Sequence, residues 1–202
     1  MTLLQVGRQE FPELKMTYLA ALIPTGVAMN FAGFAIRQAF GVPLFLNTGG
    51  IILVGLIAGP WPAATVGLLT ALVNGIVFNP VQAIPFISIV AGLIVGYMAQ
   101  YGFSRTWLGI LLMALALAAG LSVASAIQYT ILAGGFTGTA VDVLTAVIMK
   151  ASGKVVASVF TAHFFSSIID KAILFAIDLA ILKALPPQYR RLTPMYAGME
   201  TE

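Results

Sequence analysis

The chain has 202 residues, of which 60% are hydrophobic and only 8% are charged, and its formal net charge is +3. Soluble domains carry roughly a quarter charged residues, so this composition excludes an ordinary soluble domain and predicts an integral membrane protein. The absence of cysteine excludes disulfides, thiolate metal sites and lipid attachment at cysteine.

Six apolar segments follow one another along the chain, separated by glycine, proline, asparagine and charged residues. A helix of about 20 apolar residues crosses the hydrocarbon of a bilayer. The predicted spans are residues 16–40, 44–58, 62–78, 83–101, 106–133 and 155–185. We therefore expect an all-α protein, with residues 1–202 forming one domain, an integral membrane bundle of six transmembrane helices.

Two stretches depart from this pattern. Segment 44–58 is short for a span, which predicts a helix that starts below the membrane surface after irregular backbone in the sequence FGVPLFLNTGG. Residues 137–153 are polar and glycine-rich at their start but apolar from Val141 to Met149. We expect a loop there with a short re-entrant or interfacial helix.

Basic residues indicate the orientation in the membrane. With six spans both termini share a side, and that side holds six basic residues: Arg8, Lys15, Arg105, Lys183, Arg190 and Arg191. The other side holds Arg37, Lys150 and Lys154. Basic residues favour the cytosol, so we expect a multi-pass protein of the cell membrane with both termini cytosolic and no cleaved signal peptide. The basic residues orient the protein, and we expect no nucleic-acid partner.

Small residues form three close-packing patterns. The first segment carries a seam at spacings of four and three, made of Ala21, Thr25, Ala28, Ala32 and Ala35. Two glycine pairs lie further on, Gly55 with Gly59 and Gly92 with Gly96. Each pattern is compatible with packing inside the bundle, and the five-residue seam is the best candidate for a partner surface.

Polar side chains in the outward half of the apolar segments are candidates for substrate binding, because they are costly in lipid. They are Gln38, Asn47, Asn74, Asn79, Gln82, Gln128, Tyr129 and His163. Amides and a neutral imidazole both donate and accept, which suits a polar, mostly uncharged heterocycle. Stacking faces are available from Phe40, Phe45, Phe78, Phe86 and Phe136. The alternative for each polar residue is a helix cap or a bond to a neighbouring carbonyl. His163 is the only histidine and predicts no metal site.

Three charged residues, Asp170, Lys171 and Asp178, lie within the last apolar segment. We expect a buried charge network or a partner interface, because such charges do not persist facing lipid. Adjacent residues on a helix point about 100° apart, which predicts separate partners for Asp170 and Lys171. Lys171 and Asp178 are too far apart for a direct bridge.

The stretches LFLNTGGIILVGLIAGPWPAATVGLLTALVNGI and IIDKAILFAIDLAILKALP resemble the substrate-binding S components of energy-coupling factor (ECF) transporters. The resemblance covers nearly the whole chain. It implies a subunit that binds a vitamin or related micronutrient, imported with a transmembrane coupling protein and two ATPase subunits. In that family an Ala-xxx-Ala pattern on the first helix docks the coupling protein. Ala28 and Ala32 match it, and Ala21 with Thr25 is an alternative. The nickel and cobalt members carry an N-terminal histidine cluster that this sequence lacks, so the resemblance implies no metal import.

Other functions remain as alternatives. A secondary transporter of this size would need to dimerise, and a membrane ligand sensor would need a separate output partner. No HExxH, paired catalytic aspartates or nucleophile turn occurs, so we expect no enzyme activity, no catalytic residues and no cofactor.

Overall fold

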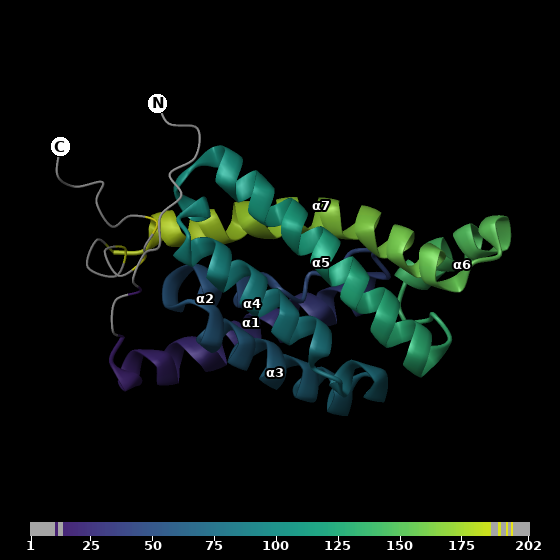
Figure 1. Cartoon of the computed structure of the whole chain (residues 1–202). Helices are drawn as coiled ribbons and strands as arrows, with labels where there is room; N and C mark the ends of the chain where they lie inside the picture. The colour runs from purple at the N-terminus through teal and green to yellow at the C-terminus, as the bar shows by residue number, and fades with distance from the viewer. Residues whose placement is uncertain (1–10, 12–13, 187–189, 191–192, 194, 196–202) are drawn as a thin grey trace.

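The computed structural model describes residue 11, residues 14–186 and residues 190, 193 and 195. These residues form helices joined by short connections, with no strand among them, which confirms the all-α prediction (Figure 1). The helices are α1 (Met16–Phe40), α2 (Gly49–Ala58), α3 (Pro60–Val77), the 3-10 turn η1 (Pro80–Ala83), α4 (Phe86–Gln100), the 3-10 turn η2 (Phe103–Arg105), α5 (Trp107–Ala133), α6 (Val141–Ser152) and α7 (Val155–Ala184).

Apolar side chains cover much of the outside of this helical bundle. Ile76, Trp107 and Phe165, for example, are all exposed, as expected for a surface that lipid solvates. Within the described residues, three helices are long and apolar enough to cross a membrane: α1, α3 and α5. This is fewer than the six spans predicted. α2 and α4 have only 10 and 15 residues, and α7, although it has 30 residues, includes four charged ones and is not among the three. The apolar helices are those of a membrane protein.

The short helix α2 occupies the centre of the bundle, in contact with α1, α3, α4 and α7. Residues 49–56 are all buried. Glycine permits the close approach to α1, because a Cβ at Gly50 would lie 1.9 Å from the carbonyl oxygen of Gly26. At the other end, Gly59 with φ +86° lets the chain turn directly into α3, which begins with Pro60.

Irregular backbone precedes α2, as its short apolar segment predicted. Residues 41–48 form no helix, so the predicted segment 44–58 is helical only from Gly49. Within this stretch Leu46 adopts φ 50°, a conformation that is uncommon for a residue other than glycine. Phe45 and Leu46 are nevertheless partly buried and Thr48 is buried. Irregular backbone at this depth needs hydrogen-bond partners from other segments.

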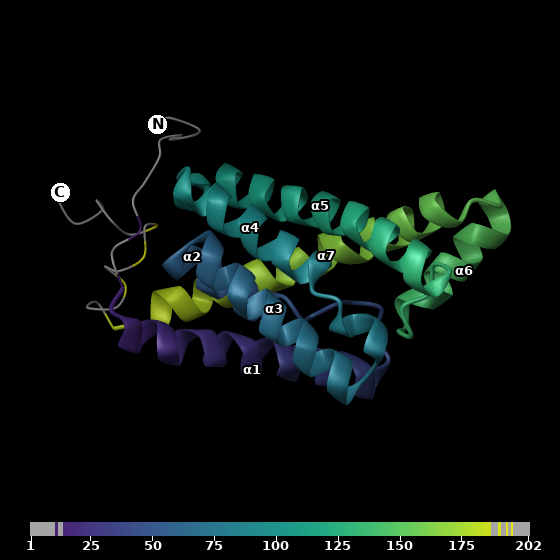
Figure 2. The same cartoon turned by 60° about the horizontal axis from the view of Figure 1, so that its bottom comes forward.

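The two ends of the bundle differ. The first turn of α1 and the last turn of α7 lie at one end, and α6 lies at the opposite end beside α5 and α7 (Figure 2). α6 contains the apolar stretch predicted between Val141 and Met149. The helix is amphipathic, with Val141 and Thr145 buried and Val143 and Val147 exposed. The end carrying α6 is called the α6 end below.

Candidate functional site

A small polar cavity lies between the last turn of α1, the irregular segment before α2, η1, α4, α5 and α7. The centre of a water molecule can reach about 40 Å³ of it, which is room for water but not for an aromatic ring. The residues that line it are Arg37, Phe45, Asn47, Thr48, Gln82, Ile84, Ile87, Ser88, Leu121, Ser125, Gln128, Tyr129, Thr137 and Ser167. Amides, hydroxyls and one guanidinium therefore converge on one space inside an apolar bundle.

Side chains of α5 fix one wall of the cavity by holding η1. The Tyr129 hydroxyl donates to Oε1 of Gln82 over 3.3 Å, and Nε2 of Gln128 donates to the carbonyl of Val81 over 3.4 Å. Nε2 of Gln82 in turn donates to the carbonyl of Thr137 over 3.3 Å. Three segments distant in sequence therefore meet at this wall.

Asp142, in the first turn of α6, holds the loop that carries Thr137. Its Oδ1 accepts from the backbone N–H and the hydroxyl of Thr137, both at 2.8 Å. Its Oδ2 accepts from the N–H groups of Gly138 and Thr139. A carboxylate that accepts several backbone N–H bonds at a helix start stabilises both the loop and the helix. α6 is thereby tied to the cavity wall.

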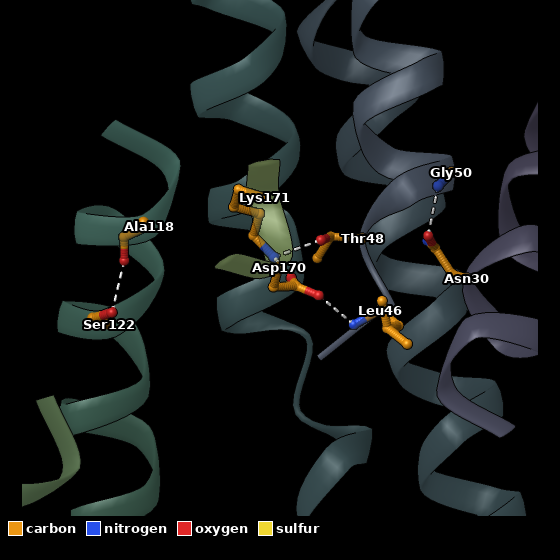
Figure 3. Close-up of polar contacts among 8 residues, drawn as sticks. All are labelled: Asn30, Leu46, Thr48, Gly50, Ala118, Ser122, Asp170 and Lys171. Atoms are coloured by element: carbon orange, nitrogen blue, oxygen red, sulfur yellow. Dashed lines mark hydrogen bonds and ion pairs between the residues drawn. The ribbon is translucent and has the colours of Figure 1, made fainter. Parts of the chain in front are cut away.

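On the other side, a buried ion pair anchors the irregular segment before α2 (Figure 3). Nζ of Lys171 donates to Oδ2 of Asp170 and, over 2.7 Å, to the hydroxyl of Thr48. Oδ1 of Asp170 accepts from the backbone N–H of Leu46 over 2.7 Å. Both charged side chains are 0% exposed. These four residues, Leu46, Thr48, Asp170 and Lys171, are called the ion-pair cluster.

The prediction that Asp170 and Lys171 have only separate partners is therefore wrong. Their Cβ atoms do diverge on α7, but the four-carbon stem of lysine is flexible and brings Nζ back to its neighbour. Each residue also has a partner of its own, as predicted, and both partners lie on the segment before α2, which was not predicted. Buried charge is stabilised when it is paired and hydrogen-bonded, and both conditions hold here.

Two more polar residues surround the start of α2. Oδ1 of Asn30 accepts from the N–H of Gly50 over 2.7 Å, and its Nδ2 donates to the hydroxyl of Thr70 over 3.0 Å (Figure 3). Asp178 is 0% exposed, and neither of its oxygens has a hydrogen-bond partner in the described part of the chain. A Cβ at Gly49 would lie 3.9 Å from its Oδ1. Asp178 therefore lies by the positive end of the α2 dipole, apart from the ion-pair cluster.

Arg37 has a different environment, although it is only 3% exposed. Its guanidinium lies 4.4 Å from the ring centre of Phe34 and 5.6 Å from that of Phe45. Among the described residues it has no ion pair, and its Nε has no hydrogen-bond partner. Asp142 and Asp170 act on it electrostatically, but both have the partners given above. Arg37 is thus a buried cation that lines the cavity, with no ion pair and no partner for its Nε among the described residues.

His163 adjoins the same region from α7. Its ring lies 5.0 Å from Phe45 and 5.5 Å from Tyr129, measured between ring centres. The side chain is 1% exposed, and neither ring nitrogen has a partner in the part of the chain that the structure describes. A buried imidazole with both nitrogens free is unusual, since buried polar groups are generally hydrogen-bonded.

The residues predicted to bind substrate fall into three groups. Four of them line the cavity, and His163 packs against two of its aromatic walls: Asn47, Gln82, Gln128, Tyr129 and His163. Asn79 caps η1 by accepting from the N–H of Val81, and Asn74 is buried on α3 outside the cavity lining. Gln38 is exposed on α1 and does not line the cavity.

The aromatic candidates separate in the same way. Phe45 alone lines the cavity, whereas Phe78 packs against Phe34 with ring centres 4.6 Å apart. The other three, Phe40, Phe86 and Phe136, are exposed.

The small-residue patterns also divide. The glycine pairs pack inside the bundle, since a Cβ at Gly92 would lie 2.5 Å from the backbone of Ala64 and one at Gly96 would lie 2.2 Å from Pro60. In the α1 seam, by contrast, Ala28 and Ala32 are exposed. Asn30 between them points to the buried side and does not interrupt the exposed face.

Arg37 was interpreted from the sequence only as an outward basic residue. Its position inside the apolar run of α1 is a usable signal, since a charge there implies a site or a partner. The serines of the cavity, Ser88, Ser125 and Ser167, carry no such signal, because hydroxyls in membrane helices commonly bond their own backbone.

Comparison with protein-family models, with curated proteins and with solved structures finds no match to this chain. Its similarity to ECF S components therefore stays a prediction from the sequence. Among the described residues, no group of three or more His, Asp or Glu side chains is arranged to hold a metal ion.

Proposed function

We propose that this chain is the membrane-embedded substrate-binding subunit of an ECF-type importer, which binds a small water-soluble micronutrient from outside. The observation that carries the proposal is the polar cavity, whose amides, hydroxyls and guanidinium converge inside an otherwise apolar bundle. Ligand sites of this kind are concave, with a few convergent polar groups. The chain carries no nucleotide-binding motif, so energy for uptake comes from a transmembrane coupling protein and two ATPases.

In this proposal the chain crosses the cell membrane six times. α1, α3 and α5 are long enough alone, and α7 with 30 residues buries its charges within the bundle. α2 spans the membrane together with residues 41–48, which precede it, and α4 spans it together with η1. Both termini are cytosolic, because Lys15, Arg105 and Lys183 lie at the ends of described helices on one side. The α6 end then faces outward.

The exposed α1 seam supports a docking partner. α1 lies on an outer flank of the bundle (Figure 2), and Ala28 and Ala32 there contribute little side-chain bulk. Close to the start of α1, Tyr18, Leu22 and Ile57 line an apolar groove that also includes Ala21 and Thr25. Small exposed residues let a second helix approach closely, so the coupling protein docks along this face.

Uptake in reconstituted vesicles tests the proposal. The purified chain is expected to retain small molecules from the cell that mass spectrometry identifies, and to import them only with a coupling protein, ATPases and ATP. Gradient-driven accumulation by the chain alone would instead identify a secondary transporter. Binding without any transport in either setting would favour a ligand sensor.

Docking has its own test. Replacing Ala28 and Ala32 with Leu adds bulk where the helices meet, so uptake is expected to be lost while ligand binding by the isolated chain stays unchanged. A matched double substitution to Ser keeps the side chains small and is expected to preserve uptake. Unchanged uptake in the Leu variant would show that the coupling protein docks elsewhere.

A further inference from the structure

The cavity contains a cation that forms no ion pair with a described residue, although Asp142 and Asp170 attract it from further away. Arg37 is 3% exposed and lines the cavity, yet it has no ion pair within the described residues. A guanidinium keeps its charge in proteins, and burying an uncompensated charge is expensive. Its Nε also lacks a hydrogen-bond partner there, so donors of the group remain available.

Among the described buried cations this cost falls on Arg37, because the other one, Lys171, is compensated. Lys171 bonds to Asp170 and Thr48 and is therefore not free to bind a ligand. Asp142 holds the loop before α6 and is equally engaged. The cavity thus offers one positive charge and no unengaged carboxylate among the residues that line it.

Resting on the proposed function, we propose that the substrate is a small organic acid in which one carboxylate is carried on a planar ring, and that Arg37 binds the carboxylate. A guanidinium matches a carboxylate geometrically, with two parallel N–H donors facing two oxygens. One cation balances one anionic charge, whereas a phosphate dianion would leave net charge in a low-dielectric interior. This differs from the mostly uncharged ligand that the amides alone suggest.

The walls of the cavity account for the ring. Phe45 lies beside Arg37, with its ring centre 5.6 Å from the guanidinium carbon, and the ring centre of His163 lies 5.0 Å from that of Phe45. The backbone beside Phe45 is held by the bond from the Leu46 N–H to Asp170, so only the Phe45 side chain has to turn to make room. A ring therefore enters by displacing Phe45, and Gln82 and Gln128 remain to bond its polar edge.

Matched acid and amide pairs test the proposal on the purified, detergent-solubilised chain. Benzoate is compared with benzamide and nicotinate with nicotinamide, each pair having nearly the same shape but different charge, and inorganic phosphate is a further probe. Calorimetric titration measures affinity, and the unfolding midpoint provides a second measurement. We expect at least one acid to bind about tenfold or more tightly than its amide, as one charged hydrogen-bonded contact predicts.

Variants then locate the effect. Arg37→Gln is expected to remove the preference for the acid, and Arg37→Lys to retain only part of it, because lysine keeps the charge without the fork. Lys150→Gln removes the same charge from an exposed position at the same end of the bundle and is expected to leave the preference intact. The acid-to-amide comparison on the unaltered chain does not depend on how any variant folds.

Several results would overturn the inference. They are equal binding of acids and amides, binding of phosphate as tight as that of the best acid, no binding by any probe, or an unchanged preference in Arg37→Gln. If the molecule recovered with the chain is neutral and is imported with ATP, the inference of an acidic substrate is wrong but the proposed function stands. Acid binding at Arg37 without uptake in the reconstituted system would overturn the proposed function alone.

Discussion

Two buried cations lie within 6 Å of the centre of the Phe45 ring and differ in their environment. Lys171 is paired with Asp170 and bonded to Thr48, while Arg37 packs against the rings of Phe34 and Phe45 and forms no ion pair with a described residue. The charge of Lys171 is paired and hydrogen-bonded within the protein, so this cluster stabilises the fold and holds the irregular segment before α2 in place. Arg37 lacks an ion pair and a partner for its Nε among the described residues, as expected of a group kept for a ligand. Completeness of partners, rather than burial or charge, distinguishes the two roles.

The largest expected effect comes from breaking the ion-pair cluster. Lys171→Met leaves Asp170 as a buried, unpaired charge, so the free energy of unfolding is expected to fall by about 3–5 kcal/mol. Equilibrium unfolding in detergent, followed by circular dichroism, measures it. The double variant Asp170→Asn with Lys171→Met is the control, because Asn retains an acceptor for the Leu46 N–H and no charge remains. It is expected to recover most of the loss, and a single variant as stable as the unaltered chain would remove the cluster from this account.

A smaller loss is expected at the start of α2. Asn30→Leu leaves the N–H of Gly50 and the hydroxyl of Thr70 without their partner in the interior, which costs about 1–3 kcal/mol. The same unfolding measurement applies, with Gln38→Leu as the matched control, because Gln38 is an exposed amide on the same helix. If Asn30→Leu left the free energy of unfolding unchanged, the hydrogen bonds of Asn30 would not stabilise the start of α2.

Arg37→Met is expected to act in the opposite direction. Removing a buried cation that has no described partner should leave the free energy of unfolding unchanged or raise it by about 1 kcal/mol, while acid binding is lost. Stability gained together with binding lost is the signature of a functional residue. A loss as large as that of Lys171→Met would place Arg37 among the structural groups.

The smallest effect is expected at His163. Its nitrogens have no described partner and its ring packs between Phe45 and Tyr129, so His163→Phe preserves the packing and forfeits no hydrogen bond. We expect the free energy of unfolding to change by less than about 1 kcal/mol, because Phe is an apolar ring only somewhat larger than His. His163→Ala, which leaves a cavity, is the contrasting variant and should cost more. Equal losses in both variants would indicate a hydrogen bond to the imidazole.

Segment boundaries were predictable where apolar length decides them. The first predicted span coincides with α1, and the shortness of the second segment indicated irregular backbone before α2, because a short apolar run leaves that part without a helix. Asn47, Gln82, Gln128 and Tyr129 were recognised as polar residues in apolar surroundings and do line one cavity.

Contacts between segments distant in sequence could not be predicted from residue spacing along the chain. The bond from Leu46 to Asp170 joins positions 124 residues apart, and no spacing along the chain encodes it. The Asp170 to Lys171 contact depends on a lysine rotamer, which helix geometry alone does not determine. Arg37 is distinguished by the lack of an ion pair among the described residues, and this lack is visible only in the three-dimensional structure. The sequence alone also could not distinguish Gln38, which is exposed on the same turn of α1 as Arg37, from the polar residues that line the cavity.

Photolabelling with 4-azidobenzoate, an aryl carboxylate that reacts where it binds, shows whether Arg37 holds a ring carboxylate in the cavity. We expect light to attach it to peptides containing Phe45 or Tyr129, excess benzoate to prevent this, and Arg37→Gln to abolish it while Lys150→Gln does not. Labelling that maps instead to the lipid-facing helices or to the groove at Tyr18, or that is equally strong in Arg37→Gln, would contradict this expectation.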